Sequence, residues 1–154
     1  MPSRRNFLIA AGGLAGGIGL GSTAGVAHAS PEEMQAAIRK VTGQAPVRRG
    51  RVKLDMPPLI DNSNSVSLSV AVESPMTPAD HVKAIHVFTE KNPLPNVVSV
   101  FLGPRAGRAS IATRVRIADT QTVTAIAEFS DGSFWSGSAS VVVTLSACLE
   151  EGLI

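Results

Sequence analysis

Cys148 is the only cysteine of this 154-residue sequence, and its position is difficult to explain by packing. It follows the last apolar strand pattern, in a stretch where no alternation gives it a buried face. Chain termini are poorly ordered unless they are tied down. We therefore interpret residues 146–154 as a C-terminal arm that exposes the Cys148 thiol. Fully extended, the chain from Leu145 to Ile154 spans about 33 Å, so the arm could carry a group attached at the thiol into a partner's active site.

The residues alone leave three roles open for that thiol. A lone cysteine excludes an internal disulfide, a zinc finger and a cysteine-ligated iron–sulfur cluster. In an oxidising compartment an accessible thiol forms disulfides with any thiol it meets. Cys148 is therefore a candidate carrier or redox thiol, a candidate for a disulfide between two molecules, or an inert thiol.

Little else in the sequence suggests chemistry. His81 and His86 are an odd number of positions apart, so a strand would place them on opposite faces, and Met76 precedes them. A Met/His copper site is an alternative, but a turn that enters a strand explains the same residues. There is no Gly-rich phosphate loop before a helix and no Ser/His/Asp set with a recognisable spacing. We expect no catalytic residue, no metal and no cofactor.

Residues 1–29 have the features of a twin-arginine export signal. Arg4 and Arg5 are followed by an uncharged, Gly- and Ala-rich run from Ile9 to Val26, and Ala27-His28-Ala29 forms a small-x-small cleavage site. We expect a mature chain that begins at Ser30, is periplasmic and has no membrane segment after cleavage. An uncleaved N-terminal anchor is the alternative.

Composition excludes two broad classes of protein. With 44% apolar and 17% charged residues, the chain is not of the disordered type. The net charge is +2, and removal of Arg4 and Arg5 with the signal leaves 12 basic and 12 acidic residues. A neutral mature chain is not a strongly basic nucleic-acid binder. Local charge is uneven, because four basic residues follow one another closely and could face an anion, an acidic partner or only solvent: Arg48, Arg49, Arg51 and Lys53.

The segment 30–64 is expected to hold one short helix and an irregular basic and proline-containing loop. Ser30 can cap the helix, Pro31 suits its first position, and Glu33 completes a capping box. Gly43 ends the pattern. Between these limits the apolar residues recur at helical spacing: Met34, Ala37, Ile38 and Val41.

Beyond Asn64 the apolar period changes from helical spacing to two, which is typical of half-buried strands. Turn residues such as Asn92-Pro93 and Asp131-Gly132 separate the apolar runs at short intervals, too short for helical crossovers. The pattern predicts an all-β, antiparallel β-sandwich core over residues 65–145. We expect its strands near residues 66–72, 82–89, 97–102, 111–117, 123–129 and 138–145.

Several blocks, in order along the mature chain, resemble the SoxY family, the sulfur-carrier subunits of the periplasmic thiosulfate-oxidation (Sox) system. The resemblance covers essentially the whole mature chain together with the twin-arginine signal. The blocks are Ser74-Pro75-Met76-Thr77-Pro78 with Asp80-His81-Val82, Glu90-Lys91-Asn92-Pro93, Gly107-Arg108-Ala109, Thr113-Arg114-Val115-Arg116 and Asp131-Gly132-Ser133-Phe134-Trp135.

This resemblance implies an immunoglobulin-like sandwich that forms a heterodimer with a second sandwich subunit, SoxZ. It also implies that a haem-containing enzyme loads thiosulfate onto the C-terminal cysteine, which is Cys148 here, and that partners including a sulfate-releasing hydrolase act on the bound sulfur. The carrier performs no catalysis alone and needs no cofactor of its own.

The arm departs from the family pattern, in which the cysteine typically lies within Gly-Gly-Cys-Gly-Gly. Here Ser146 and Ala147 precede Cys148, and Glu150 and Glu151 follow it. Non-glycine residues stiffen the backbone, and nearby carboxylates disfavour a thiolate. The alternative function is therefore a periplasmic binding or scaffolding sandwich that keeps the partner surface without the carrier chemistry.

Overall fold

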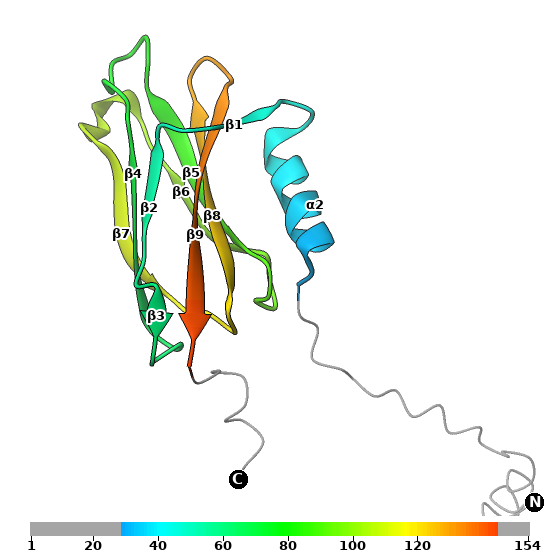
Figure 1. The fold of residues 1–154 in the computed structure, drawn as a ribbon. Helices are drawn as coiled ribbons and strands as arrows, with labels where there is room; N and C mark the ends of the chain where they lie inside the picture. The colour runs from blue at the N-terminus through cyan, green and yellow to red at the C-terminus, as the bar shows by residue number, and fades with distance from the viewer. Residues whose placement is uncertain (1–28, 145–154) are drawn as a thin grey trace, which may run out of the picture.

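A computed structural model describes residues 29–144 of the chain as two β-sheets that face each other, with one helix against the outer side of the larger sheet (Figure 1). The larger sheet has the order β1-β9-β8-β5-β6, with β3 also paired to β9, and the smaller has the order β2-β4-β7. The elements are α2 (Pro31–Thr42), β1 (Val47–Arg49), β2 (Val52–Asp55), β3 (Leu59–Ile60), β4 (Val66–Val72), β5 (Val82–Thr89), β6 (Asn96–Phe101), a 3-10 turn (Pro104–Ala106), β7 (Ala109–Val115), β8 (Gln121–Phe129) and β9 (Phe134–Val143).

The predicted all-β sandwich with one short N-terminal helix is confirmed. Within residues 29–144, no helix is long and apolar enough to cross a membrane. Two local features differ from expectation. Residues 47–60 contain three short strands where an irregular loop was predicted, and two of them, β1 and β3, run parallel to β9 rather than antiparallel. Strands of two to four residues are too short to show a periodicity of their own.

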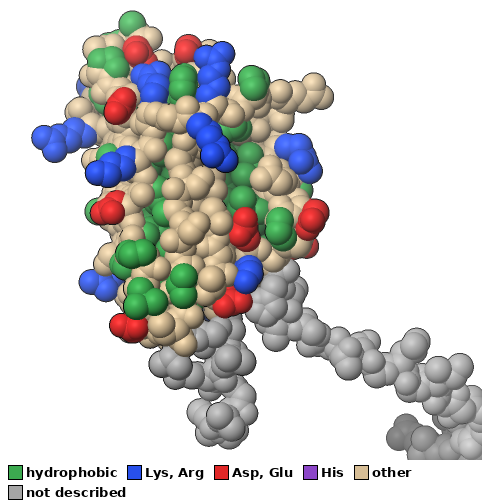
Figure 2. All heavy atoms as spheres, in the orientation of Figure 1, with side chains coloured by type: hydrophobic (Ala, Val, Ile, Leu, Met, Phe, Trp, Pro, Cys, Tyr) green, Lys and Arg blue, Asp and Glu red, His purple; other side chains and the backbone are tan. Residues whose placement is uncertain are grey.

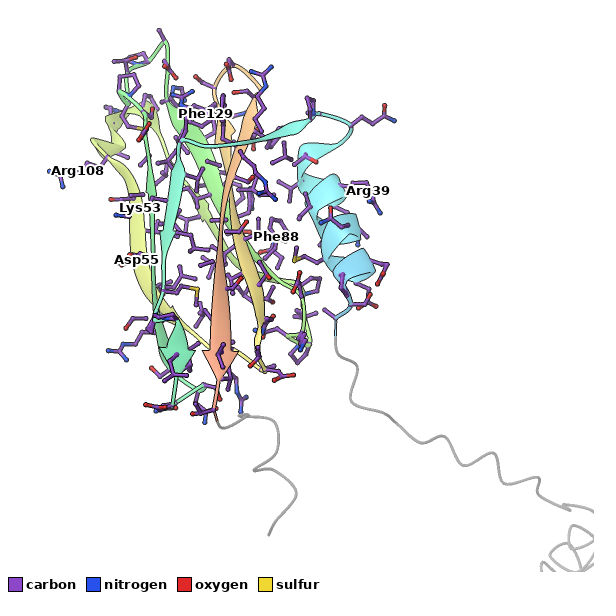
Figure 3. All side chains as sticks on the ribbon, viewed as in Figure 1. Arg39, Lys53, Asp55, Phe88, Arg108 and Phe129 are labelled. Carbon is purple, nitrogen blue, oxygen red and sulfur yellow. The ribbon has the colours of Figure 1, made fainter. Side chains whose placement is uncertain are left out.

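The main core lies between the sheets and follows the predicted alternation. The buried positions of β4 and β8 face each other there, and Phe129 at the end of β8 is 1% exposed (Figure 3). The buried stripe of these two strands consists of Val66, Leu68, Val70, Val72, Val123, Ala125, Ala127 and Phe129.

A second apolar cluster explains why Phe88 of β5 and Ile126 of β8 are buried on the face of the larger sheet that points away from the main core. Met34 and Ile38 of α2 pack on Phe88, Ile126 and Phe134 on the outer side of the larger sheet (Figure 3). The capping box that fixes the start of α2 is present as predicted, since the Glu33 backbone N–H donates to the hydroxyl of Ser30 and the Ser30 N–H donates to the Glu33 carboxylate.

Candidate functional site

Cys148 lies outside the described residues, but the strand that leads to it is fixed by hydrogen bonds from two sides. On the β3 side, the N–H of Thr144 donates to the carbonyl oxygen of Ile60 at 3.0 Å, and the N–H of Val142 donates to that of Pro58 at 2.9 Å. On the β8 side, the N–H of Val143 donates to the hydroxyl of Thr120 at 3.0 Å. The end of β9 is therefore a defined root for the segment that carries the thiol.

The hydroxyl of Thr144 lies between two further acceptors at this root and donates its one proton to them. Its hydroxyl oxygen lies 3.1 Å from the carbonyl oxygen of Ile60 and 3.1 Å from Oδ1 of Asp61. Because residues 60 and 144 are far apart in sequence, these contacts tie the last described residue to the loop that follows β3. The buried side chain of Ile60, 3% exposed, anchors that loop in the main core.

Covalent geometry limits where the thiol can be. The Cα atom of Cys148 is four residues beyond that of Thr144, so the two atoms are at most about 14 Å apart. The ten residues of β9 span about 33 Å. Whatever its conformation, the chain from Thr144 to Cys148 is too short to reach the β8–β9 turn, which lies at the other end of the sandwich from β3 (Figure 1).

Charged groups of both signs surround this root. Lys91 pairs with Asp119 at 3.2 Å, and both side chains are about half exposed, so solvent screens the pair and it contributes little stability. Glu90 accepts from the backbone N–H of Thr122, which begins the hydrogen bonding of β8. Together with Asp61, these groups make the end of the sandwich mixed in charge rather than basic.

The four clustered basic residues lie elsewhere, along β1, β2 and the bend between them. The guanidinium of Arg51 stacks over the ring of Phe129 at 4.0 Å, and Arg48 lies 5.7 Å from the ring centre of Trp135. Stacking of this kind gives about 0.5–1 kcal/mol at exposed positions. Two of the four residues therefore have a structural role that the sequence did not indicate, while contact of Arg49 and Lys53 with an anion or acidic partner stays a prediction.

The histidines and Met76 do not converge. His81 precedes β5 and its Nδ1 lies 3.1 Å from the carbonyl oxygen of Thr77, while the sulfur of Met76 accepts from the N–H of Val82. His86 lies within β5, 2.8 Å from the hydroxyl of Ser99. In the part of the chain that the structure describes, no group of three or more His, Cys, Asp or Glu side chains is arranged to hold a metal ion.

His86 should make the fold less stable in mild acid. Its side chain is 5% exposed, and burial lowers its pKa below the ordinary value of 6.5, with the carboxylate of Glu128 opposing that shift in part. As the pH falls through about 6.5, the unfolded chain takes up a proton at His86 before the folded chain does, so stability falls with pH. We expect His86→Gln to weaken the dependence of the urea midpoint on pH between 8 and 5. An unchanged dependence in the variant would contradict the assignment, and His81→Gln is the control.

Comparison with known sequences identifies one family. The sequence model of the family described as sulfur oxidation protein SoxY matches residues 38–148. The matched region ends at the position of the lone cysteine. No curated protein sequence matches the chain.

Comparison with solved structures supports the sandwich fold. The sulfur carrier protein SoxY from Chlorobium limicola f thiosulfatophilum is 24% identical, with a TM-score of 0.64 over 75% of this chain and 100% of that chain. A superoxide reductase (neelaredoxin) from Ignicoccus hospitalis is 11% identical, with a TM-score of 0.54 over 75% and 94%. A putative superoxide reductase from Thermotoga maritima is 18% identical, with a TM-score of 0.54 over 65% and 89%. At these identities each likeness shows the fold alone.

Proposed function

The chain belongs to the SoxY family of sulfur oxidation proteins, and on that premise we propose that it carries sulfur intermediates of thiosulfate oxidation covalently on Cys148. Membership of this family makes it a sulfur carrier of the Sox system rather than an enzyme. The observation that carries the proposal is that the family match extends to residue 148, the only thiol of the chain, four residues beyond an anchored strand end.

The loading step joins two sulfur atoms. The thiol of Cys148 and the outer sulfur of thiosulfate form an S–S bond, the thiol proton is released, and two electrons leave, which the haem of a loading enzyme would pass on one at a time to an oxidised cytochrome. The product is a cysteine S-thiosulfonate. In a later step, water attacks the terminal sulfonate group, sulfate and a proton leave, and a persulfide remains on Cys148. This chain supplies the thiol and its placement, and partner enzymes supply the redox and hydrolytic groups.

The protein's surroundings follow from the same proposal. It forms a heterodimer with a SoxZ-type sandwich subunit and works in the periplasm after twin-arginine export and removal of residues 1–29. The arm, and all of the signal except its last residue, Ala29, lie outside the residues that the structure describes.

Intact-mass measurement of the protein purified from thiosulfate-grown cells tests this function. Samples are acid-quenched without reductant, and we expect a thiosulfonate or persulfide adduct on the peptide that contains Cys148, together with a mature chain that begins at Ser30. Treatment with a reductant should remove the adduct, and cells grown without thiosulfate provide the control. A chain found only with a free thiol, or only as a simple disulfide dimer, would contradict the proposal.

A second function is kept because of one feature of the arm. Glu150 and Glu151 follow Cys148 by two and three positions in the sequence, and carboxylates near a thiol oppose thiolate formation and repel an anionic substrate. A scaffolding sandwich without carrier chemistry would bind its partner subunit normally and show an unmodified Cys148 in the same mass measurement.

A further inference from the structure

The outward face of β9 changes character at its last residues. Ser138 and Ser140 are exposed and polar, as expected of a strand with one solvent-facing side, but Val142, at the next outward position, is 49% exposed. Its neighbour across the parallel β3–β9 pair is Leu59, which is 57% exposed. Two large apolar side chains thus lie side by side where β9 ends.

The preceding turn extends this surface. Pro57 and Pro58 are also exposed, and the hydrogen bond from the Val142 N–H to the Pro58 carbonyl holds this segment against β9. Hydrophobic side chains gather over β3 and the end of β9 on the face shown in Figure 2. We name this surface, formed by Pro57, Pro58, Leu59 and Val142, the root patch.

The short distance in sequence between Thr144 and Cys148 limits how far from the root patch an enzyme that acts on Cys148 can bind. Cys148 is at most about 14 Å from Thr144, and Val142 is only two residues before Thr144. An enzyme that takes Cys148 into a recessed active site must therefore press its entrance against the end of β9. Among residues 29–144, the other exposed large apolar side chains are Leu94 and Phe101. Phe101 lies near the opposite end of the sandwich, so an enzyme at the end of β9 would contact the root patch and would not contact Phe101.

We propose that the root patch is the docking surface for the enzyme that loads sulfur onto Cys148, with an apolar rim around that enzyme's substrate channel as its complement. The proposal rests on the carrier function proposed above. Its physical basis is that docking would remove the exposed apolar surface of Leu59 and Val142 from water, which favours the complex, whereas the exposed Lys91–Asp119 pair nearby contributes little.

The test compares the loading rate of the mature protein, in its heterodimer with the SoxZ-type subunit, with that of the same heterodimer carrying the double variant Leu59→Thr/Val142→Thr. Threonine suits exposed strand positions and keeps the β-branching of Val142, so the fold is retained, which circular dichroism checks. Purified haem-containing loading enzyme, thiosulfate and oxidised cytochrome c as electron acceptor give the enzymatic rate. The reaction of Cys148 with a small maleimide gives the enzyme-free reactivity. Phe101→Thr, which removes a side chain that is 76% exposed at the other end, is the matched control.

We expect the double variant to raise the KM of the loading enzyme for the carrier about tenfold, with the maleimide rate unchanged and Phe101→Thr at the wild-type rate. Equal KM values for variant and wild type would overturn the docking inference alone. A faster maleimide reaction in the double variant would overturn the proposal in another way, because it would mean that residues 149–154 of the same chain dock on the root patch. A wild-type dimer that the variant dissociates would mean that a second copy occupies it. If wild-type protein acquires no adduct, the carrier function fails and the docking inference fails with it.

Discussion

Replacing Cys148 with serine is expected to remove every thiosulfate-derived adduct from the protein and to leave its thermal unfolding unchanged. A serine hydroxyl cannot form the S–S bond on which the proposed loading step depends, and no other thiol exists in the chain to replace it. Cys148 follows the end of β9, the last strand among residues 29–144, by five positions and is not itself among the described residues. Intact mass of the variant after incubation with loading enzyme and thiosulfate measures the first expectation, and a melting curve measures the second.

A displaced thiol makes a sharper control than simple removal. The double variant Ser146→Cys/Cys148→Ser keeps one thiol in the arm but brings it two residues nearer to the root at Thr144. If loading requires the reach of the arm, this variant reacts with maleimide like the wild type yet is loaded poorly by the enzyme. Growth on thiosulfate that is unaffected by Cys148→Ser would favour the scaffolding function over the carrier.

The elements that depend on local patterns were predictable from the sequence. The capping box of Ser30 and Glu33 and the alternation of β4 and β8 are patterns of residues close together in the sequence, and such patterns suffice to predict a helix start and a half-buried strand. The start of β9 was missed by four residues because Phe134 and Trp135 follow directly on the Asp131-Gly132-Ser133 turn. In the structure the two aromatic residues already pair with Glu128 and Ala127 of β8.

What the sequence could not provide is pairing between distant segments. The parallel contacts of β1 and β3 with β9 join residues more than 80 positions apart, and nothing in two- to four-residue strands encodes a partner. The same limit applies to the site. Cys148 could be selected by residue type and position, whereas its root, with Thr144 bonded to Asp61, and the exposed pair Leu59 and Val142 exist only because β3 is placed beside β9.

Gly137→Ala is expected to destabilise the sandwich by about 2 kcal/mol. Gly137 lies in β9, next to the segment that connects β1 in the larger sheet with β2 in the smaller one. A Cβ atom added at Gly137 would collide with the backbone carbonyl oxygen of Val52. Backbone atoms cannot rotate away as a side chain can, so β2 must shift. The adjacent bond from the Gly50 N–H to the carbonyl oxygen of Ser136, 3.1 Å long, would be strained or lost as well.

Chemical denaturation of the mature protein measures this effect, and Gly103→Ala is the matched control. A Cβ atom at Gly103 meets nothing within 4 Å, and the φ angle there, −111°, is one that alanine adopts freely, so we expect that variant to unfold with the wild type. The same denaturation midpoint for Gly137→Ala and wild type would show that β2 is free to move away from β9. Because Gly137 lies near the start of β9 and the arm follows its end, Gly137→Ala protein kept below its unfolding transition should still be loaded at Cys148. Loss of stability without loss of loading would show that Gly137 allows the two sheets to approach each other, and that it has no part in presenting the thiol at the end of β9.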